Sequence, residues 1–255
     1  MYKWGAHYMS SETHLQDVRT RLMTVELLKT AKKRYTYREL SMKTGLPITV
    51  LSRYVKGHVL PTTKRAKMIW NTLDVMISLQ DELRKRVKFD ELGYFDNTNI
   101  VCDVPLLQQA AQFILRKFAG KRITRVITAA VDGVPLSTII AGALGVDLVI
   151  AKRTKEVGVR EFVEETYIPS DSAMIMAYYI PRGSLKKGDS VLIVDDIIRS
   201  GETQRALVNL IRKARADVAG IFALVSVGKD WKKKFLDIPE FPVEIILEVQ
   251  APAQH

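Results

Sequence analysis

The stretch Val191-Leu-Ile-Val-Asp-Asp-Ile-Ile-Arg-Ser-Gly-Glu-Thr203 decides the fold of the second part of the chain. Its first four residues are apolar and predict a buried parallel strand, and Asp195 and Asp196 follow where that strand should end. Small polar residues then lead into residues 204–214, where apolar residues recur at helical spacing. A strand, a tight loop and a helix N-terminus bring free backbone N–H groups together, which is a common setting for an anion site. Because the carboxylates suit hydroxyl groups or a metal ion beside the anion, the stretch predicts a sugar-phosphate site.

This stretch resembles the phosphoribosyl-pyrophosphate (PRPP) signature of type I phosphoribosyltransferases, an apolar strand with two acidic residues and a Thr/Ser-Gly-Gly-Thr-like loop. The resemblance implies that the two aspartates hold the ribose hydroxyls and that the loop wraps the 5′-phosphate. One departure is Glu202, which stands where the family more often has Gly and brings a carboxylate near the proposed phosphate. The alternative is an ordinary parallel strand that happens to end in Asp-Asp. The residues predicted to bind PRPP here are Asp195, Asp196, Ile197, Ile198, Arg199, Ser200, Gly201, Glu202 and Thr203.

Two further segments predict anion contacts. An apolar strand over residues 125–130 runs into the loop Val131-Asp-Gly-Val-Pro135 and a helix over residues 136–144. In the resembling family this loop cradles pyrophosphate and often holds a non-proline cis peptide, which here falls near residues 130–132. A third strand, residues 147–151, is followed by two cations, at the strand end where ligands of open α/β sheets bind. The alternative for the cations is ordinary surface charge. The residues predicted to contact the pyrophosphate are Val131, Asp132, Gly133, Lys152 and Arg153.

Residues 155–171 show no clear periodicity, and the resemblance places the family's flexible active-site loop here. The segment holds two cations against five carboxylates, although a transferase needs positive groups where charge develops in the transition state. We take this as an argument against efficient catalysis, and we assign no catalytic residue.

The charge of the 255-residue chain is concentrated near its start. Residues 1–90 hold 18 Lys and Arg against 8 Asp and Glu, whereas residues 91–255 hold 21 against 20. A basic module joined to a nearly neutral one predicts two domains, the first of which meets a polyanion, with nucleic acid as the leading candidate.

The basic third carries a second motif after a helix expected over residues 15–32, in which Leu22 is expected on the buried face. Thr36 and Glu39 form a capping box for a short helix, and Gly45 supplies a left-handed turn. Pro47 then opens a second short helix that Gly57 terminates. This pattern predicts a helix-turn-helix, and its spacing resembles the repressor type of microbial regulators. The buried side of the second helix is expected to be Val50, Leu51, Tyr54 and Val55.

The second helix is then the recognition helix, whose outward residues contact base edges and phosphates, while other cations position the domain on the phosphate backbone. The alternative is a small helical packing module with a solvated basic surface. The residues predicted to bind DNA are Lys43, Thr49, Ser52, Arg53, Lys56, Lys64, Arg65 and Lys67.

Residues 63–88 are predicted to form one long connecting helix. Apolar residues with one polar interruption follow a heptad-like spacing, which suits either pairing with a second copy or packing on the chain's own core. These residues are Ile69, Leu73, Met76, Gln80, Leu83 and Val87.

The predicted fold class is α/β. An all-α helix-turn-helix domain over residues 1–72 and a connecting helix over 73–90 precede a type I phosphoribosyltransferase-like, doubly wound parallel sheet over 91–255. Residues 1–11 are expected to be a loosely attached start. Other expected elements are a helix at 104–118, an amphipathic segment at 231–235 and strands at 173–180, 191–194, 218–227 and 243–249.

Together the two domains resemble phosphoribosyltransferase-type transcriptional regulators, which include purine-repressor and archaeal sugar-catabolism regulator types. The resemblance implies a homodimeric DNA-binding regulator that senses PRPP or a related nucleotide, with Mg²⁺ bound through the ligand. One alternative is an active purine or orotate phosphoribosyltransferase with an appended module, and another is an RNA-associated protein with a vestigial fold. Cys102 is the single cysteine and the histidines are scattered, so we expect no disulfide and no structural metal. Without a signal peptide or membrane span, a cytoplasmic location is expected.

Overall fold

The computed structural model describes residues 14–169, 174–235 and 241–251, and it divides the chain into two compact units after Ser78. The helical unit ends at Ser78 and the sheet unit begins at Leu79. This division falls inside the segment 73–90 that was expected to connect two domains. The predicted loose start, residues 1–11, lies outside the described residues.

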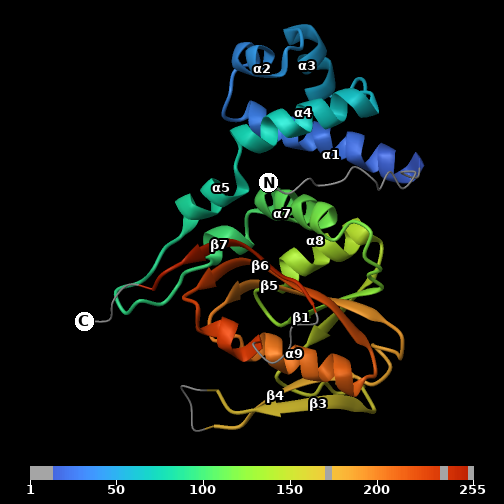
Figure 1. Cartoon of the computed structure of the whole chain (residues 1–255), viewed down its shortest axis with the longest axis vertical. Coiled ribbons are helices and arrows are strands. Elements are labelled where there is room, and N and C mark those ends of the chain that lie inside the picture. Colours follow the sequence, from blue (N-terminus) through green and yellow to red (C-terminus); the bar gives the residue numbers. More distant parts are fainter. Residues whose placement is uncertain (1–13, 170–173, 236–240, 252–255) are drawn as a thin grey trace, which may run out of the picture. The chain divides into compact units, whose positions relative to one another are not determined.

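The helical unit contains α1 (His14–Lys32), α2 (Tyr37–Thr44), α3 (Ile48–Val55) and α4 (Thr63–Met76) (Figure 1). Its core is apolar, and Leu28, Leu40, Leu51 and Ile69 have no exposed surface. The described part of the N-terminal third is therefore all-α, as predicted. Leu22, expected on the buried face of α1, is instead 48% exposed.

The two short helices begin and end where their local signals predict. The Thr36 hydroxyl accepts from the Glu39 N–H at 3.2 Å, and the Glu39 carboxylate accepts from the Thr36 N–H at 2.7 Å. Gly45 then takes a left-handed conformation with φ 67°, which glycine adopts without the clash of a Cβ. Pro47 precedes α3, whose Leu51 and Tyr54 are buried. This helix pair is the scaffold of the predicted helix-turn-helix, whose binding to DNA stays a prediction.

The prediction of one continuous helix over residues 63–88 is wrong. Helix α4 ends at Met76, and α5 (Leu79–Arg86) is a separate element of the sheet unit. Ile77 leaves the helical conformation, with φ −123° and ψ 70°, and its side chain stays in the core of the helical unit. Leu79 and Leu83 are buried in the other core. The heptad-like residues therefore pack on the chain's own two cores, the second of the alternatives that the sequence left open.

The sheet unit is built on five parallel strands in the order β2-β1-β5-β6-β7. These strands are β1 (Arg125–Ala129), β2 (Asp147–Ala151), β5 (Ser190–Ile198), β6 (Asp217–Val227) and β7 (Val243–Val249). The stretch quoted first becomes the central strand, since β5 pairs with β1 on one side and β6 on the other. Strand β5 is longer than predicted, so Asp195 and Asp196 lie within it rather than after its end.

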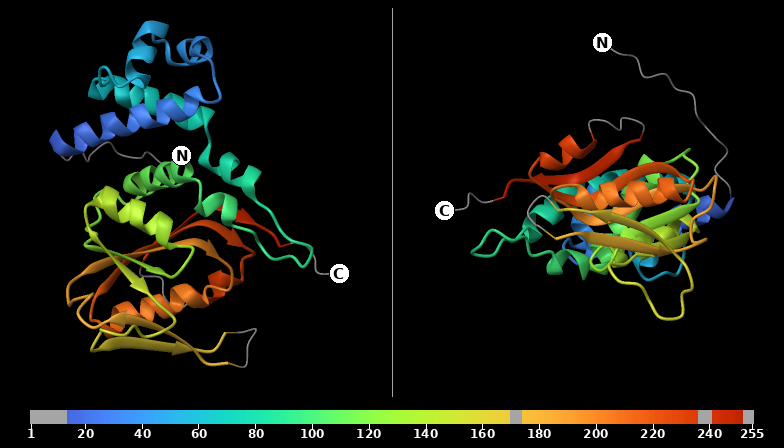
Figure 2. Two further views of the ribbon diagram at one scale, coloured as in Figure 1. Left: turned by 180° about the vertical axis from the view of Figure 1, so that it is seen from behind. Right: turned by 90° about the horizontal axis from the view of Figure 1, so that it is seen from below.

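Helices cover both faces of this sheet. Helices α7 (Val104–Lys117) and α8 (Val134–Leu144) lie on one face and α9 (Glu202–Lys213) on the other, as Figure 1 and the reverse view in Figure 2 show. Neighbouring strand residues alternate between the two cores, with Phe222 toward α7 and α8 and Ile221 toward α9. This confirms the predicted α/β class with a doubly covered parallel sheet. The short elements α6 (Thr98–Val101) and η1 (Asp230–Phe235) complete the described helices.

The predicted loop over residues 155–171 is wrong for residues 162–167, which form a strand. Strands β3 (Phe162–Tyr167) and β4 (Met176–Pro181) form a two-stranded antiparallel sheet beside α9 (Figure 1). The strand pattern was hidden because Glu165 occupies an inward position, where Lys213 and Asn209 of α9 neutralise and bind its carboxylate. Asp171 and the predicted start of the second strand at Ala173 lie outside the described residues.

Candidate functional site

The acidic pair near the carboxyl end of β5 is buried and held by amide side chains. Asp195 is 7% exposed and Asp196 is 4% exposed. The Gln204 side-chain amide donates to Asp195 Oδ2 at 2.6 Å, and the Asp196 N–H donates to Asp195 Oδ1 at 3.1 Å. The Asn97 side-chain amide donates to Asp196 Oδ2 at 2.6 Å. Both carboxyl oxygens of Asp195 thus accept hydrogen bonds from the protein, and Asn97 binds the carboxyl of Asp196.

Burial makes this pair difficult to ionise fully. Loss of hydration raises the pKa of Asp195 well above its usual range, and the neighbouring charge of Asp196 raises it further. Burial also raises the pKa of Asp196, against the opposing effect of the Asn97 hydrogen bond, and the charge of Asp132 adds to the rise. A ligand that brings hydroxyl donors or a cation to the pair favours its charged form.

The loop between β1 and α8 approaches the acidic pair closely. The peptide bond between Ala130 and Val131 is cis, which confirms the expected position of such a bond. A Cβ added to Gly133 would stand 2.3 Å from Thr128 Oγ1 and 2.8 Å from Asp195 Oδ1. The structure therefore brings the predicted loop and the predicted carboxylates together, with Gly133 as the residue that lets them meet.

The predicted phosphate loop joins β5 to the N-terminus of α9. Gly201 has φ 79°, and a Cβ there would stand 3.2 Å from Trp231 Cα, so η1 packs against the loop. Helix α9 then directs the free N–H groups of its first turn toward the loop. The Glu202 carboxylate forms an ion pair with Lys234 of η1 at 3.4 Å. Its negative charge is therefore partly compensated by a neighbouring cation.

An aromatic group lies beside the same loop. The Thr203 hydroxyl and the Tyr178 hydroxyl are 3.5 Å apart, and the Arg153 guanidinium lies 5.7 Å from the centroid of the Tyr178 ring. Tyr167 stacks on Tyr178 with ring centroids 5.7 Å apart, and burial with the neighbouring Tyr178 raises the pKa of Tyr167 to about 12. Of the two predicted cations, Arg153 is thus the one that lies beside the Tyr178 ring.

Lys152 is directed elsewhere. Its ammonium forms an ion pair with Glu156, and both residues line a cavity of about 240 Å³ together with Phe162 and Tyr179. A role for Lys152 at a pyrophosphate requires a different side-chain conformation and stays a prediction.

In the segment 155–171, the carboxylates within the described residues are paired with cations. Their partners lie after β2, after β4, on α9 and in the segment itself. These ion pairs are Glu156 with Lys152, Glu161 with Arg182, Glu164 with Lys155, and Glu165 with Lys213. Local compensation of charge weakens the argument against catalysis that rested on the formal charge of this segment.

The residues predicted to bind DNA lie on the surface of the helical unit. Thr49, Arg53 and Lys56 are exposed on α3 or at its end, and Ser52 is half-buried. Arg65 is exposed but donates to the Tyr54 hydroxyl at 3.2 Å, which ties the start of α4 to α3. The remaining predicted residues are also exposed, namely Lys43, Lys64 and Lys67.

Sequence reasoning missed residues that reach the site from other elements. Asn97 lies 99 positions before its partner Asp196, and no local pattern indicates such a contact. Gln204 stood at the start of a predicted helix, and its spacing from Asp195 is the only signal that could have indicated a contact. Tyr178 and Lys234 likewise reach the loop only through the tertiary fold.

The described residues contain neither a cluster of metal-ligating side chains nor a helix suited to a membrane. No group of three or more His, Cys, Asp or Glu side chains there is arranged to hold a metal ion. No described helix has the length and apolar character needed to cross a membrane.

Comparison with known proteins identifies relatives of the sheet unit. The family described as "Phosphoribosyl transferase domain" matches residues 104–250. The purine biosynthesis transcriptional repressor PurR of Bacillus subtilis is 32% identical over 133 residues, covering 52% of this chain and 47% of the relative. The probable purine biosynthesis transcriptional regulator PurR of Streptococcus pneumoniae is 28% identical over 146 residues, covering 57% and 53%. The chain thus matches about half the length of these curated regulators.

Enzymes are also among the relatives. Xanthine phosphoribosyltransferase of Lactobacillus acidophilus is 27% identical over 136 residues, covering 51% of this chain and 71% of the enzyme. Among solved structures, adenine phosphoribosyltransferase from Rhodothermus marinus superimposes with a TM-score of 0.61 at 22% identity, covering 68% of this chain and 99% of that chain. This structural likeness establishes the fold of the sheet unit.

Proposed function

Because the chain belongs to the family of proteins with a phosphoribosyl transferase domain, we propose that it is a DNA-binding transcriptional regulator whose sheet unit senses PRPP or a related nucleotide. The matches to the regulators named PurR cover just over half of this chain, so the proposal for the whole chain rests on the two units taken together.

One observation carries the ligand part of the proposal. The buried acidic pair, the Gly133 loop and the N-terminus of α9 converge near the carboxyl end of the central strand β5. This end of an open parallel sheet is where ligands of such folds bind. N–H groups at a helix N-terminus suit a phosphate, and carboxylates suit ribose hydroxyls. A sugar phosphate with an attached pyrophosphate satisfies all three features.

The DNA part of the proposal rests on the helical unit. Residues 1–78 hold 14 Lys and Arg against 5 Asp and Glu. A capped short helix, a left-handed Gly45 and the exposed polar face of α3 have the form of a helix-turn-helix reader. We propose that the chain acts as a homodimer, since such readers commonly bind paired half-sites. Mg²⁺ is proposed to arrive with the ligand's pyrophosphate and hydroxyls.

The second candidate is an active purine phosphoribosyltransferase with an appended basic module. It is supported by the likeness to xanthine phosphoribosyltransferase. The pairing of the carboxylates in residues 155–167 also weakens the argument that their negative charge opposes catalysis.

A turnover assay separates the two candidates. The chain is mixed with PRPP, Mg²⁺ and a panel of nucleobases, and released pyrophosphate is measured. We expect tight PRPP binding in calorimetry with negligible pyrophosphate release. Turnover at ordinary enzyme rates, roughly 1 s⁻¹ or more, would establish the transferase instead.

A DNA assay tests the regulator. Binding to the DNA upstream of the protein's own gene is measured with and without PRPP, beside a duplex of equal length and scrambled sequence. We expect preference for the upstream DNA and a change in that preference when PRPP is added. Equal affinity for both duplexes, unaltered by PRPP, contradicts the proposal.

A further inference from the structure

Asn97 connects the acidic pair to a segment outside the phosphate-binding loops. It directly precedes α6, where an asparagine side chain commonly caps the helix by accepting from a backbone N–H. Here the side chain makes no such cap and instead donates to Asp196 at 2.6 Å. The Asp196 carboxyl is therefore already bound by a donor that the protein itself supplies.

The other end of α6 is tied to α5. Asp103, two residues after α6, accepts from the Arg86 guanidinium at 2.6 Å. Arg86 also binds Glu82 at 2.9 Å, and Glu82 is only 4% exposed within α5. A continuous set of polar contacts thus runs from Asp196 through Asn97 and α6 to α5, the first element of the sheet unit.

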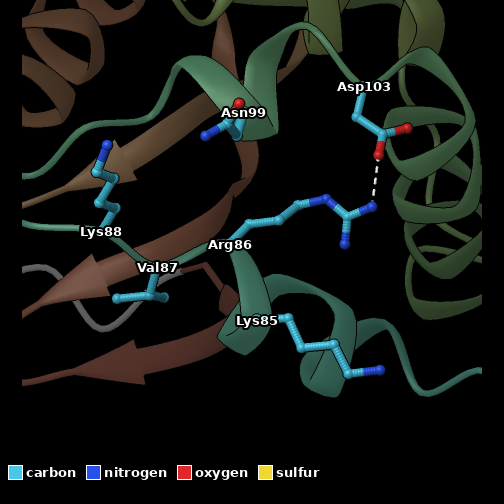
Figure 3. Close-up of a pocket in the computed structure, with 6 residues that line it drawn as sticks. All are labelled: Lys85, Arg86, Val87, Lys88, Asn99 and Asp103. Carbon is cyan, nitrogen blue, oxygen red and sulfur yellow. Dashed lines mark hydrogen bonds and ion pairs between the residues drawn. The ribbon is translucent and has the colours of Figure 1, made fainter.

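The space beside this set of contacts is open. A cavity of about 470 Å³ lies between the end of α5 and the start of α7, and Figure 3 shows Arg86 reaching toward Asp103 there. This cavity is open to solvent, so no close-packed side chains fill the space beside α6 and the end of α5, and both have room to move. The cavity is lined by Lys85, Arg86, Val87, Lys88, Asn99 and Asp103.

We propose that Asn97 is a sensing residue of the site: ligand hydroxyls displace it from Asp196, and its release loosens α6 and α5. The inference rests on the proposed function, because it assumes a hydroxyl-bearing ligand at the acidic pair. Such a ligand shifts the equilibrium because it competes for the same carboxyl and therefore binds the released state better. Helix α5 begins directly after Ser78, where the chain leaves the helical unit. The displacement of Asn97 is thus transmitted to the segment that joins the two units.

Calorimetry with PRPP and Mg²⁺ on the full chain tests the competition. We expect Asn97→Ala to bind PRPP about tenfold more tightly than the wild type, since a hydrogen bond to a charged group no longer has to be broken. Asn97→Leu, which removes the donor and keeps a side chain of similar size, is expected to act in the same direction. Asn99→Ala is the matched control, because it truncates the same residue type on the same segment away from the acidic pair. Unchanged or weaker PRPP binding by both Asn97 variants overturns the inference.

Hydrogen exchange of peptides covering residues 79–103 supplies a readout that does not depend on ligand affinity. Without ligand, Asn97→Ala is expected to exchange faster in this segment than the wild type and Asn99→Ala. PRPP is expected to speed exchange in the wild type but to add little in Asn97→Ala. Equal exchange of Asn97→Ala and wild type without ligand overturns the inference even where PRPP binds. A different result separates the two proposals. If the wild type binds no PRPP but Asn97→Ala still exchanges faster, the proposed ligand is contradicted, while the role of Asn97 in holding this segment is supported.

Discussion

The acidic pair places two like charges in a buried position, and its hydrogen bonds come from amides rather than from cations. Asn97 and Gln204 each donate to one carboxyl, but neither supplies a positive charge. Because burial raises the pKa values of both carboxyls, the pair resists full ionisation. Such a site stores part of the free energy that a cationic or hydroxyl-bearing ligand releases on binding.

Asp196→Asn is expected to stabilise the empty protein at high pH. Because the folded-state pKa values are raised above the unfolded ones, the stability that protonation contributes is present below about pH 3.8 and is lost as pH rises through the folded values. Removing one charge should then raise the free energy of unfolding at pH 8 by about 1 kcal/mol, roughly 2–4 °C in Tm.

Thermal unfolding between pH 4 and pH 8 measures this difference. The midpoints of the variant and the wild type should converge toward low pH, because protonation there neutralises the charge that the substitution removes. Asp217→Asn, which removes an exposed carboxylate from the same sheet, is the control and should show no such trend. A variant no more stable than the wild type at pH 8 contradicts the prediction.

Gly133→Ala tests the close approach of the loop to the acidic pair. The new methyl group would overlap Thr128 Oγ1 and crowd Asp195 Oδ1, so we expect a loss of about 1–3 kcal/mol in the free energy of unfolding. PRPP affinity should fall more than tenfold, since the loop must move away from the carboxylates. Denaturant unfolding and calorimetry measure the two effects.

Gly142→Ala is the matched control for this substitution. Gly142 lies within α8, and no atom stands within 4 Å of an added Cβ. Alanine there should stabilise the protein by about 0.5–1 kcal/mol, because it reduces the freedom of the unfolded chain. If both variants proved equally stable, the close packing around Gly133 would make no contribution to the free energy of unfolding.

At the scale of elements, α3 and the first turn of α4 are expected to make different kinds of contact with DNA. Arg53 is exposed on α3, the proposed reading helix, whereas Lys64 is exposed at the start of α4. Base contacts discriminate between sequences, but contacts to phosphate strengthen binding to every sequence.

Arg53→Ala should therefore weaken binding to the preferred DNA more than binding to scrambled DNA, by about 1–3 kcal/mol in the difference. Lys64→Ala should weaken binding to both DNA sequences. It should also reduce the slope of log affinity against log salt concentration by about one, the value expected for one lost phosphate contact. Fluorescence anisotropy over a salt series measures both quantities. Identical losses for the two variants on all sequences would refute the assignment of α3.

Local signals predicted most of the elements, and nonlocal contacts explain the errors. Thr36, Glu39 and Gly45 determine α2 within ten residues, so its bounds could be predicted. The break after Met76 has no Pro or Gly to announce it, because Ile77 and Leu79 turn into two different cores. Strand β3 was missed because ion pairs from α9 make an inward glutamate acceptable.

The candidate site shows the same division. The acidic pair and both anion loops are contiguous motifs, and the structure brings them together. Asn97 reaches the site from 99 residues away, which no pattern in the sequence indicates. The orientation of Lys152 toward Glu156 likewise depends on the neighbouring hairpin rather than on its place after β2.

At the scale of the whole molecule, the two units have separate cores. Trp70 is buried in the core of the helical unit, and Trp231 is buried in the core of the sheet unit. Each tryptophan therefore reports the unfolding of its own unit, once Trp4 is replaced by phenylalanine.

PRPP with Mg²⁺ should stabilise the sheet unit selectively. At a ligand concentration of one hundred times Kd, binding adds about 2.7 kcal/mol to the unit that holds the site. A chain carrying Trp4→Phe and Trp70→Phe should show this gain in fluorescence-detected unfolding. A chain carrying Trp4→Phe and Trp231→Phe should show little change. Equal gains in both chains would mean that the units unfold as one.

The helical unit precedes the central strand along the chain, and this order has a consequence for protein synthesis. The central strand β5 ends at Ile198, which is 120 residues after Ser78. At roughly 5–20 residues per second, a ribosome needs on the order of 6–24 s to cover that distance. The helical unit is thus complete before the middle of the sheet exists. Under the proposed function, a nascent chain is able to meet DNA during this interval, and it becomes responsive to the ligand only after β5 and its neighbours β6 and β7 have been made.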